Sequence, residues 1–327
     1  MQRISLICLL FLLFSCENQV DIHFSGDKIP VAYCILDLQD SIQQISLSQS
    51  YLPDYEGKEN GVGIADFKEL SGYSAYVEMW DNEDVREIYY FENSGINDPP
   101  GEPDSIYRMI LESSFTVNYG VRYKLYVVDD QDEEVFSGET VTVGNLKVLD
   151  PLLVPGRELT LTLDQGYFMS WEPPGYARVY QPIVYFNYLE SDFETVRKKQ
   201  LKIPLSININ SEQIHVIRQF MSGRHFFLAV REGIPYVPGL RRKAENLDFE
   251  ILAGGEELSI YLGKEIYGTS DFGQLNEYGN FDDAKGIFSS RSSAWVRGIE
   301  LSYITHDSLA TGLYTRQLGF IPSGEEL

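Results

Sequence analysis

Residues 121–143 read VRYKLYVVDDQDEEVFSGETVTV, and their pattern is the clearest indication of the fold class. Apolar side chains alternate with polar ones from Val121 to Val127, and a second strand-like run ends at Val143. The acidic cluster 129–134 lies between the two runs. A period of two places one face of a strand in a core and the other in water, and a polar cluster between two such runs indicates a turn. We therefore predict an antiparallel β-hairpin here.

The same pattern recurs toward the N-terminus. Shorter alternating runs occupy residues 31–35, 45–47 and 73–79, and the last of them precedes the turn cluster at 81–84. Several short strands separated by turn signals are typical of an antiparallel sandwich. The sequence therefore predicts a mainly β protein whose residues 29–148 form an immunoglobulin- or fibronectin-like β-sandwich.

A linker with two prolines, residues 149–157, divides the chain, because proline disfavours both helix and central strand. Strand patterns continue over residues 158–327, for which we predict a second β-rich, fibronectin-like domain with inserted helices. One helix is expected within 211–232, where Ser211 can cap it and apolar residues recur at helical spacing. A short C-terminal helix is expected from Asp307 to Leu318.

The balance of charge excludes one class of partner. The chain has 327 residues and a formal net charge of −23 at pH 7. Residues 16–148 carry 26 acidic and 8 basic side chains, whereas residues 149–327 carry 23 and 17. A surface this acidic repels phosphate backbones, so we exclude nucleic acid. The difference between the two parts agrees with two domains in different surroundings.

The first residues predict export and a lipid anchor. Arg3 precedes the apolar run Ile4–Phe14, which is too short to span a bilayer. The tetrapeptide Leu13-Phe14-Ser15-Cys16 resembles the lipobox of bacterial lipoproteins, in which a signal peptide is cleaved before an acylated cysteine. We therefore expect a signal peptide at 1–15, lipid on Cys16 and a polar tether at 16–28. The alternative is an ordinary cleaved signal peptide with an incidental cysteine.

No pattern of a catalytic or metal site stands out. The four histidines form no His-Glu-x-x-His pair, and no glycine loop for phosphate occurs. Residues 130–134 resemble a calcium loop, but Val135 stands where such a loop needs glycine, so an exposed turn is favoured. Cys34 lies in an apolar run, and we expect it to be a buried core residue without a disulfide. We expect no enzyme, no metal and no cofactor, although a carboxylate pair would leave no mark in the sequence.

Basic residues that stand out in so acidic a chain are candidate contacts for a partner or for lipid phosphates. Two clusters qualify: Arg197, Lys198 and Lys199 with Lys202, and the run Arg241, Arg242 and Lys243. The alternative for both clusters is solvated loop charge. Arg291 is a further candidate for ligand contact, with pairing to a nearby carboxylate as its alternative.

Several blocks carry a resemblance to a known family. They are residues 253–261 (AGGEELSIY), 286–291 (GIFSSR) and 314–320 (YTRQLGF), together with the start Cys16-Glu17-Asn18. These blocks are similar to a Bacteroidota lipoprotein family of unknown function. The resemblance implies a cell-envelope lipoprotein with an immunoglobulin-like first domain, often encoded beside a TonB-dependent outer-membrane receptor, and it carries over no functional residue. In physical terms, Gly254-Gly255 suits a turn from strand to helix.

Three functions stay open from the sequence. The first is a non-enzymatic accessory lipoprotein that works with an outer-membrane β-barrel transporter in nutrient capture. The second is a structural or adhesive surface module, and the third is a hydrolase. We expect the protein on the outer membrane, and Glu17 and Asp21 weakly resemble the acidic export signals of surface-exposed lipoproteins. The ligand is unknown.

Overall fold

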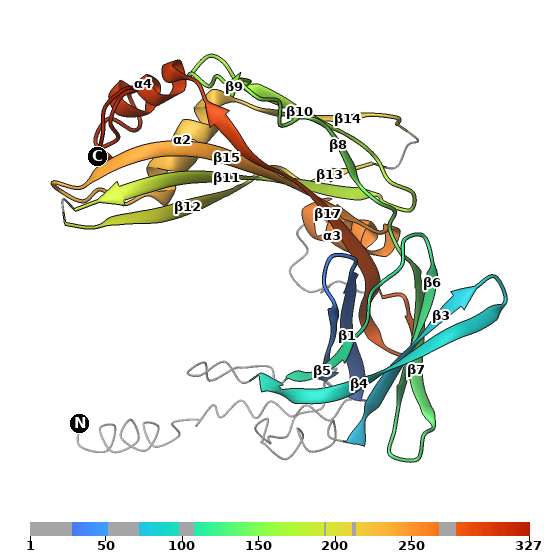
Figure 1. Cartoon of the computed structure of the whole chain (residues 1–327). Helices are drawn as coiled ribbons and strands as arrows, with labels where there is room; N and C mark the ends of the chain where they lie inside the picture. The colour runs from blue at the N-terminus through green and yellow to red at the C-terminus, as the bar shows by residue number, and fades with distance from the viewer. Residues whose placement is uncertain (1–27, 52–71, 98–107, 193, 211–213, 268–278) are drawn as a thin grey trace, which may run out of the picture.

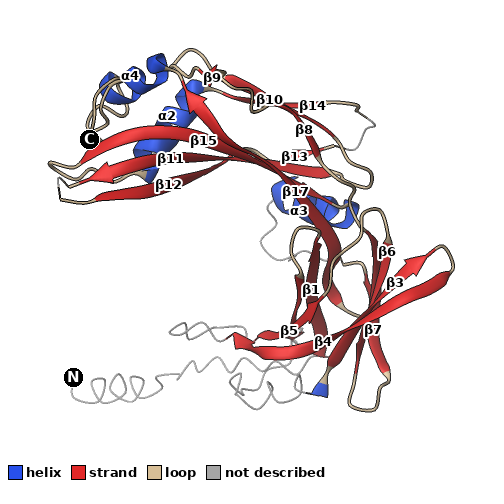
Figure 2. Ribbon diagram, in the orientation of Figure 1, coloured by secondary structure: helices blue, strands red, loops and turns tan. Residues whose placement is uncertain are grey.

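The computed structural model describes residues 28–51, 72–97, 108–192, 194–210, 214–267 and 279–327. The predicted signal peptide, Cys16 and the tether up to residue 27 lie outside the described residues. Strands dominate the described part and a few short helices accompany them (Figure 1, Figure 2). The prediction of a mainly β fold is confirmed. None of the described helices is long and apolar enough to cross a membrane.

The first part of the chain is an immunoglobulin-like sandwich. Its strands are β1 (Lys28–Asp37), β2 (Ile42–Tyr51), β3 (Ser74–Asp81), β4 (Asp84–Asn97), β5 (Arg108–Ser114), β6 (Arg122–Val128) and β7 (Glu134–Val141). One sheet has the order β1-β2-β5-β4 and the other the order β4-β3-β6-β7. These are the strand orders of immunoglobulin domains, with β4 shared between the two sheets. Cys34, Val77 and Leu125 lie buried in the core, as predicted for Cys34.

The stretch 121–143 forms the predicted hairpin. Strands β6 and β7 pair in antiparallel fashion, and the carboxylate of Asp129 accepts the backbone N–H groups of Gln131 and Glu133 across the turn, each at 2.9 Å. At the start of β6, the hydroxyl oxygen of the fully buried Tyr123 accepts the N–H of Asn118 at 3.0 Å. This is the tyrosine corner of immunoglobulin-like sandwiches, and it fastens the connection between β5 and β6.

The second part is a sandwich of three strands against four. Its strands are β8 (Lys147–Asp150), β9 (Glu158–Leu159), β10 (Tyr167–Glu172), β11 (Val179–Ser191), β12 (Val196–Pro204), β13 (Asn208–Ile209), β14 (Ile217–Met221), β15 (Arg241–Gly254) and β17 (Lys285–Leu301). The short strand β16 (Phe281–Asp282) pairs instead with β7 of the first sandwich. The sheet β14-β10-β8 faces the sheet β12-β11-β15-β17. Trp171 of β10 meets Tyr180 of β11 in the core, with 5.8 Å between ring centroids. Three strands against four in this order is the fibronectin type III arrangement, as predicted.

Strand β17 joins the two sandwiches. Its second half pairs with β15, from Gly254 opposite Arg291 to Asn246 opposite Glu300. Its first half leaves that sheet and runs parallel to β1, with Lys285 opposite Val31. One continuous sheet therefore passes through both parts, as the long strand in Figure 1 shows. This pairing crosses the division expected at 149–157, because residues 281–291 complete the first sandwich.

The helices differ in part from the prediction. Gly254-Gly255 does turn the chain from β15 into α3 (Glu256–Tyr267). The helix expected within 211–232 was placed too early. Residues 217–221 form strand β14 beside β10, and α2 (Gly223–Gly233) begins after Ser222, whose hydroxyl accepts the N–H of His225. Pairing with a neighbouring strand decided the conformation of a segment whose apolar spacing also fits a helix. The C-terminal helix α4 (Tyr303–Thr311) likewise begins and ends earlier than expected.

Candidate binding surface

The predicted basic contacts take structural positions for the most part. Arg242 was expected as a solvated or partner-binding charge and is instead fully buried on β15, with a side-chain exposure of 1%. Its guanidinium pairs with Glu190 at 3.0 Å and donates to the carbonyl oxygens of Pro235 and Leu318. The same β15 strand carries Arg241, which pairs with Glu325. The prediction of accessible charge was wrong for Arg242, because strand pairing turns it into the sandwich interior.

Arg291 forms the local carboxylate pair that was one of its two predicted roles. Its Nε donates to Asp37 at 2.8 Å, and this contact joins β17 to β1 at the point where the two sandwiches meet. Arg197, Lys198, Lys199 and Lys202 are exposed, but they lie on the edge strand β12 and not in a loop. Lysine on an edge strand discourages pairing with other chains, so this basic strand has a sufficient structural role.

Aromatic side chains gather on the outer face of the first sandwich. Tyr90, Tyr76 and Tyr126 lie side by side across β4, β3 and β6, and we name them the tyrosine row. The ring centroids are 5.8 Å and 5.0 Å apart. Burial, and after it the negative charge of Glu78, raises the pKa of Tyr76 and of Tyr126. Their hydroxyls therefore stay protonated at neutral pH and can donate hydrogen bonds to a bound molecule.

A hollow of about 490 Å³ lies at one end of this face, beside Trp80. The Trp80 ring makes two cation–π contacts within the protein: Nζ of Lys124 lies 4.7 Å and Cζ of Arg122 lies 5.2 Å from the ring centroid. Its Nε1 donates to Glu78 at 2.9 Å. Because the ring is covered and its donor is satisfied, this hollow offers little to a ligand beyond its polar rim.

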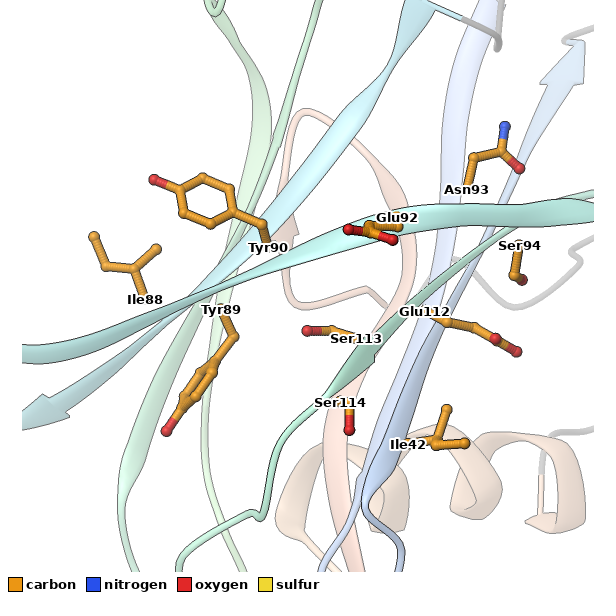
Figure 3. A pocket seen from close by; sticks show the side chains of 10 residues that line it. All are labelled: Ile42, Ile88, Tyr89, Tyr90, Glu92, Asn93, Ser94, Glu112, Ser113 and Ser114. Carbon is orange, nitrogen blue, oxygen red and sulfur yellow. The ribbon is translucent and has the colours of Figure 1, made fainter.

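A second hollow, of about 550 Å³, lies at the other end of the face, and we name it the corner notch (Figure 3). It opens where β4 leaves β3 and joins β5: residues 84–91 pair with β3, whereas residues 92–97 pair with β5. The two strands diverge on one side of this crossing. The notch is lined by Ile42, Ile88, Tyr89, Tyr90, Glu92, Asn93, Ser94, Glu112, Ser113 and Ser114.

The polar groups of the corner notch are mainly hydrogen-bond acceptors. Glu92 of β4 stands directly opposite Glu112 of β5. Gln44 of β2 donates to Glu112 at 2.6 Å, and neither carboxylate forms an ion pair within the described residues. Ser113 is only 9% exposed, and its hydroxyl can donate or accept a hydrogen bond. An arrangement of this kind suits binding of a molecule that brings donors and positive charge.

The lining carries two glutamates, three serines and two tyrosines, and no histidine, cysteine or lysine is among its residues. No group of three or more histidine, cysteine or acidic side chains in the described part of the chain is arranged to hold a metal ion.

Sequence reasoning did not find the corner notch. Glu92 and Ser113 carry no motif, and the notch depends on the point at which β4 changes partner. The uncharged run Ile88-Tyr89-Tyr90-Phe91 does not single it out either, because longer uncharged runs such as residues 41–53 occur elsewhere in the chain.

Comparisons with known proteins add little. No family model matches the chain, and a search of curated proteins found no match. Among solved structures, the chain is similar to one described as the crystal structure of DIP-gamma IG1+IG2, at 6% sequence identity and a TM-score of 0.15. The match covers 71% of this chain and 91% of that one. A TM-score this low carries no conclusion, and the fold assignment above depends on the strand order of this chain alone.

Proposed function

We propose that this chain is a lipid-anchored lipoprotein of the outer membrane that acts as a non-enzymatic accessory to a TonB-dependent transporter in nutrient capture. The observation that carries the proposal is the position of Cys16, directly after the apolar run that ends at Phe14. Acyl chains contribute about 0.8 kcal/mol for each buried CH2 group, so more than one chain on Cys16 holds a protein stably on a membrane.

Two features of the folded part support a binding role. The outer face of the first sandwich presents the tyrosine row, and tyrosine is enriched in binding interfaces because it combines apolar area with a polar tip. The corner notch adds two carboxylates without ion-pair partners in the described part of the chain. The resemblance to envelope lipoproteins encoded beside outer-membrane receptors favours a transporter as the partner.

The anchor is tested first. The full-length chain and the variant Cys16→Ser are expressed in a Bacteroidota host fed an alkyne analogue of palmitate, and the label on the protein is measured. We expect label and membrane association in the wild type, with loss of both in Cys16→Ser. Equal membrane association of the two proteins, without label, would refute the anchor.

The partner is tested by purification of the tagged full-length chain from outer membranes in mild detergent, with quantitative mass spectrometry. A β-barrel transporter recovered in stoichiometric amount supports the accessory role. Recovery of the chain alone, together with normal growth of a deletion strain on every nutrient tested, contradicts that role. Loss of surface attachment in the same deletion strain would favour the adhesive module, the second candidate function that the aromatic outer face supports.

A further inference from the structure

We infer that the corner notch binds an extended peptide segment of a partner protein, which adds as a strand along β4 and places a lysine or arginine side chain between Glu92 and Glu112. The inference rests on the proposed binding role and names the chemical class of the bound partner. Edge-strand addition is a general mode of peptide recognition, with backbone hydrogen bonds giving affinity and alternate side chains giving specificity.

The backbone of the notch is open on both of its walls. Over residues 84–91, β4 pairs with β3 on one side, and no strand among the described residues pairs with it on the other. Ser113 and Ser114 of β5 pair with β2 but not with β4. Alternate N–H and C=O groups along both walls therefore face the notch. An added strand lies about 4.8 Å from its neighbour, so a strand that pairs with the free edge of residues 84–91 would occupy the space beside β4 where the notch opens.

The usual protection of an edge strand is missing at this point. Asp84, Arg86 and Glu87 occupy the far end of β4, and charged side chains there discourage pairing with other chains. The part of β4 that borders the notch is the uncharged run Ile88 to Phe91. Tyr90 is 69% exposed and Ile88 is 43% exposed, so alternate side chains of an added strand would find apolar area beside them.

The charge of the notch defines the side chain that it accepts. Like charges directly opposite on neighbouring strands are destabilising, and Glu92 and Glu112 are such a pair. No lysine or arginine lines the notch in the described part of the chain. A cationic side chain between the two carboxylates removes the repulsion and gains charge-assisted hydrogen bonds.

Ser113 adds a polar group to the wall of the notch. The residue as a whole is 9% exposed, and it lines the notch. Its hydroxyl can donate or accept a hydrogen bond, and a peptide backbone supplies an acceptor and a donor at regular intervals along its length.

The test is a selection of peptides on the full-length chain in detergent, from a random dodecapeptide display library. Binders are compared on the double variant E92Q/E112Q, which removes both charges without changing side-chain size. The double variant D130N/E133Q is the matched control, because it removes two charges from an exposed turn of the same sandwich. Hydrogen exchange of the β4 amides with and without the best peptide locates the contact.

We expect enriched peptides with lysine or arginine at alternate positions, bound at least about tenfold more weakly by E92Q/E112Q and unchanged by D130N/E133Q. The amides of residues 88–91 should exchange more slowly in the complex. The inference is overturned if no peptide distinguishes the wild type from E92Q/E112Q, if protection falls elsewhere, or if neutral oligosaccharides occupy the notch and peptides do not. Recovery of a transporter from membranes decides the proposed function separately, so either proposal can fail alone.

Discussion

Arg242 offers the sharpest test of how the second sandwich is held together. Its side chain is 1% exposed, and the side chain of its ion-pair partner Glu190 is 18% exposed. The guanidinium also donates to two backbone carbonyls, those of Pro235 and Leu318. It therefore ties β15 to β11, to the loop after α2 and to the C-terminal segment at the same time. We predict that Arg242→Met is among the most destabilising single substitutions in this part of the chain.

The expected size of the effect follows from the contacts. Removal of one partner from a buried ion pair costs about 3–5 kcal/mol, because the other charge stays buried without compensation. The partial exposure of Glu190 favours the lower end of that range, whereas each carbonyl left without a donor adds about 1 kcal/mol or more. Methionine replaces much of the apolar stem of arginine. We therefore expect a loss of about 5 kcal/mol in the free energy of unfolding, with about 3 kcal/mol from the ion pair and about 1 kcal/mol from each of the two carbonyls.

Urea denaturation of the full chain, followed by the fluorescence of tryptophans, measures this loss, and hydrogen exchange of residues 318–321 assigns it to the second sandwich. Arg241→Met is the matched control, since Arg241 pairs with Glu325 at the surface and should change stability by less than about 1 kcal/mol. The double variant Arg242→Met/Glu190→Leu should be more stable than Arg242→Met, because it no longer buries a lone charge. A loss below about 1 kcal/mol for Arg242→Met, or a double variant less stable than the single one, would refute the reasoning.

The remaining predictions concern the joint between the sandwiches, the tyrosine corner and a junction glycine. At the joint, the carboxylate of Glu257 accepts hydrogen bonds from the hydroxyls of Thr140 and Ser289, and burial raises its pKa above 4.5. The unfolded chain therefore releases this proton first, so stability falls as pH rises from about 4.5 through the raised pKa. Glu257→Gln should make the melting temperature less dependent on pH in that range, and an unchanged dependence would contradict this. Tyr123→Phe removes the acceptor of the Asn118 N–H and should lower the free energy of unfolding, measured by urea denaturation, by about 1 kcal/mol. A decrease of less than about 0.3 kcal/mol would contradict this. Gly286→Ala would place a Cβ 1.9 Å from the carbonyl oxygen of Ala32 in β1, so this variant should open the joint to limited proteolysis. The control Gly324→Ala, at a similar positive φ, meets nothing within 4 Å and should leave the joint closed. Equal cleavage of the two variants would argue against the steric explanation.

The candidate site shows where local pattern stops being informative. The period of two identified β3 and β6 and the hairpin that follows β6, and the outward positions of Tyr76 and Tyr126 could be read from it. That the two rings meet in one row depends on the register between β3 and β6. The pairing of Glu92 with Glu112 depends in the same way on a register between strands separated by residues 98–107. No local rule fixes such a register, because it is set by the packing of whole strands.

Local sequence patterns were enough to predict the mainly β fold, many of its strands, the burial of Cys34 and the turn at Gly254-Gly255. These features depend on side-chain periodicity and backbone conformation over a few residues, which are local quantities. Only the tertiary structure decided that Arg242 is buried, that β17 serves both sandwiches and that the crossing of β4 leaves a notch. Each of these features depends on contacts between residues far apart in the chain. Whether burying a charge or leaving a strand edge unpaired stabilises or destabilises the fold depends on which residues lie beside it in the folded structure.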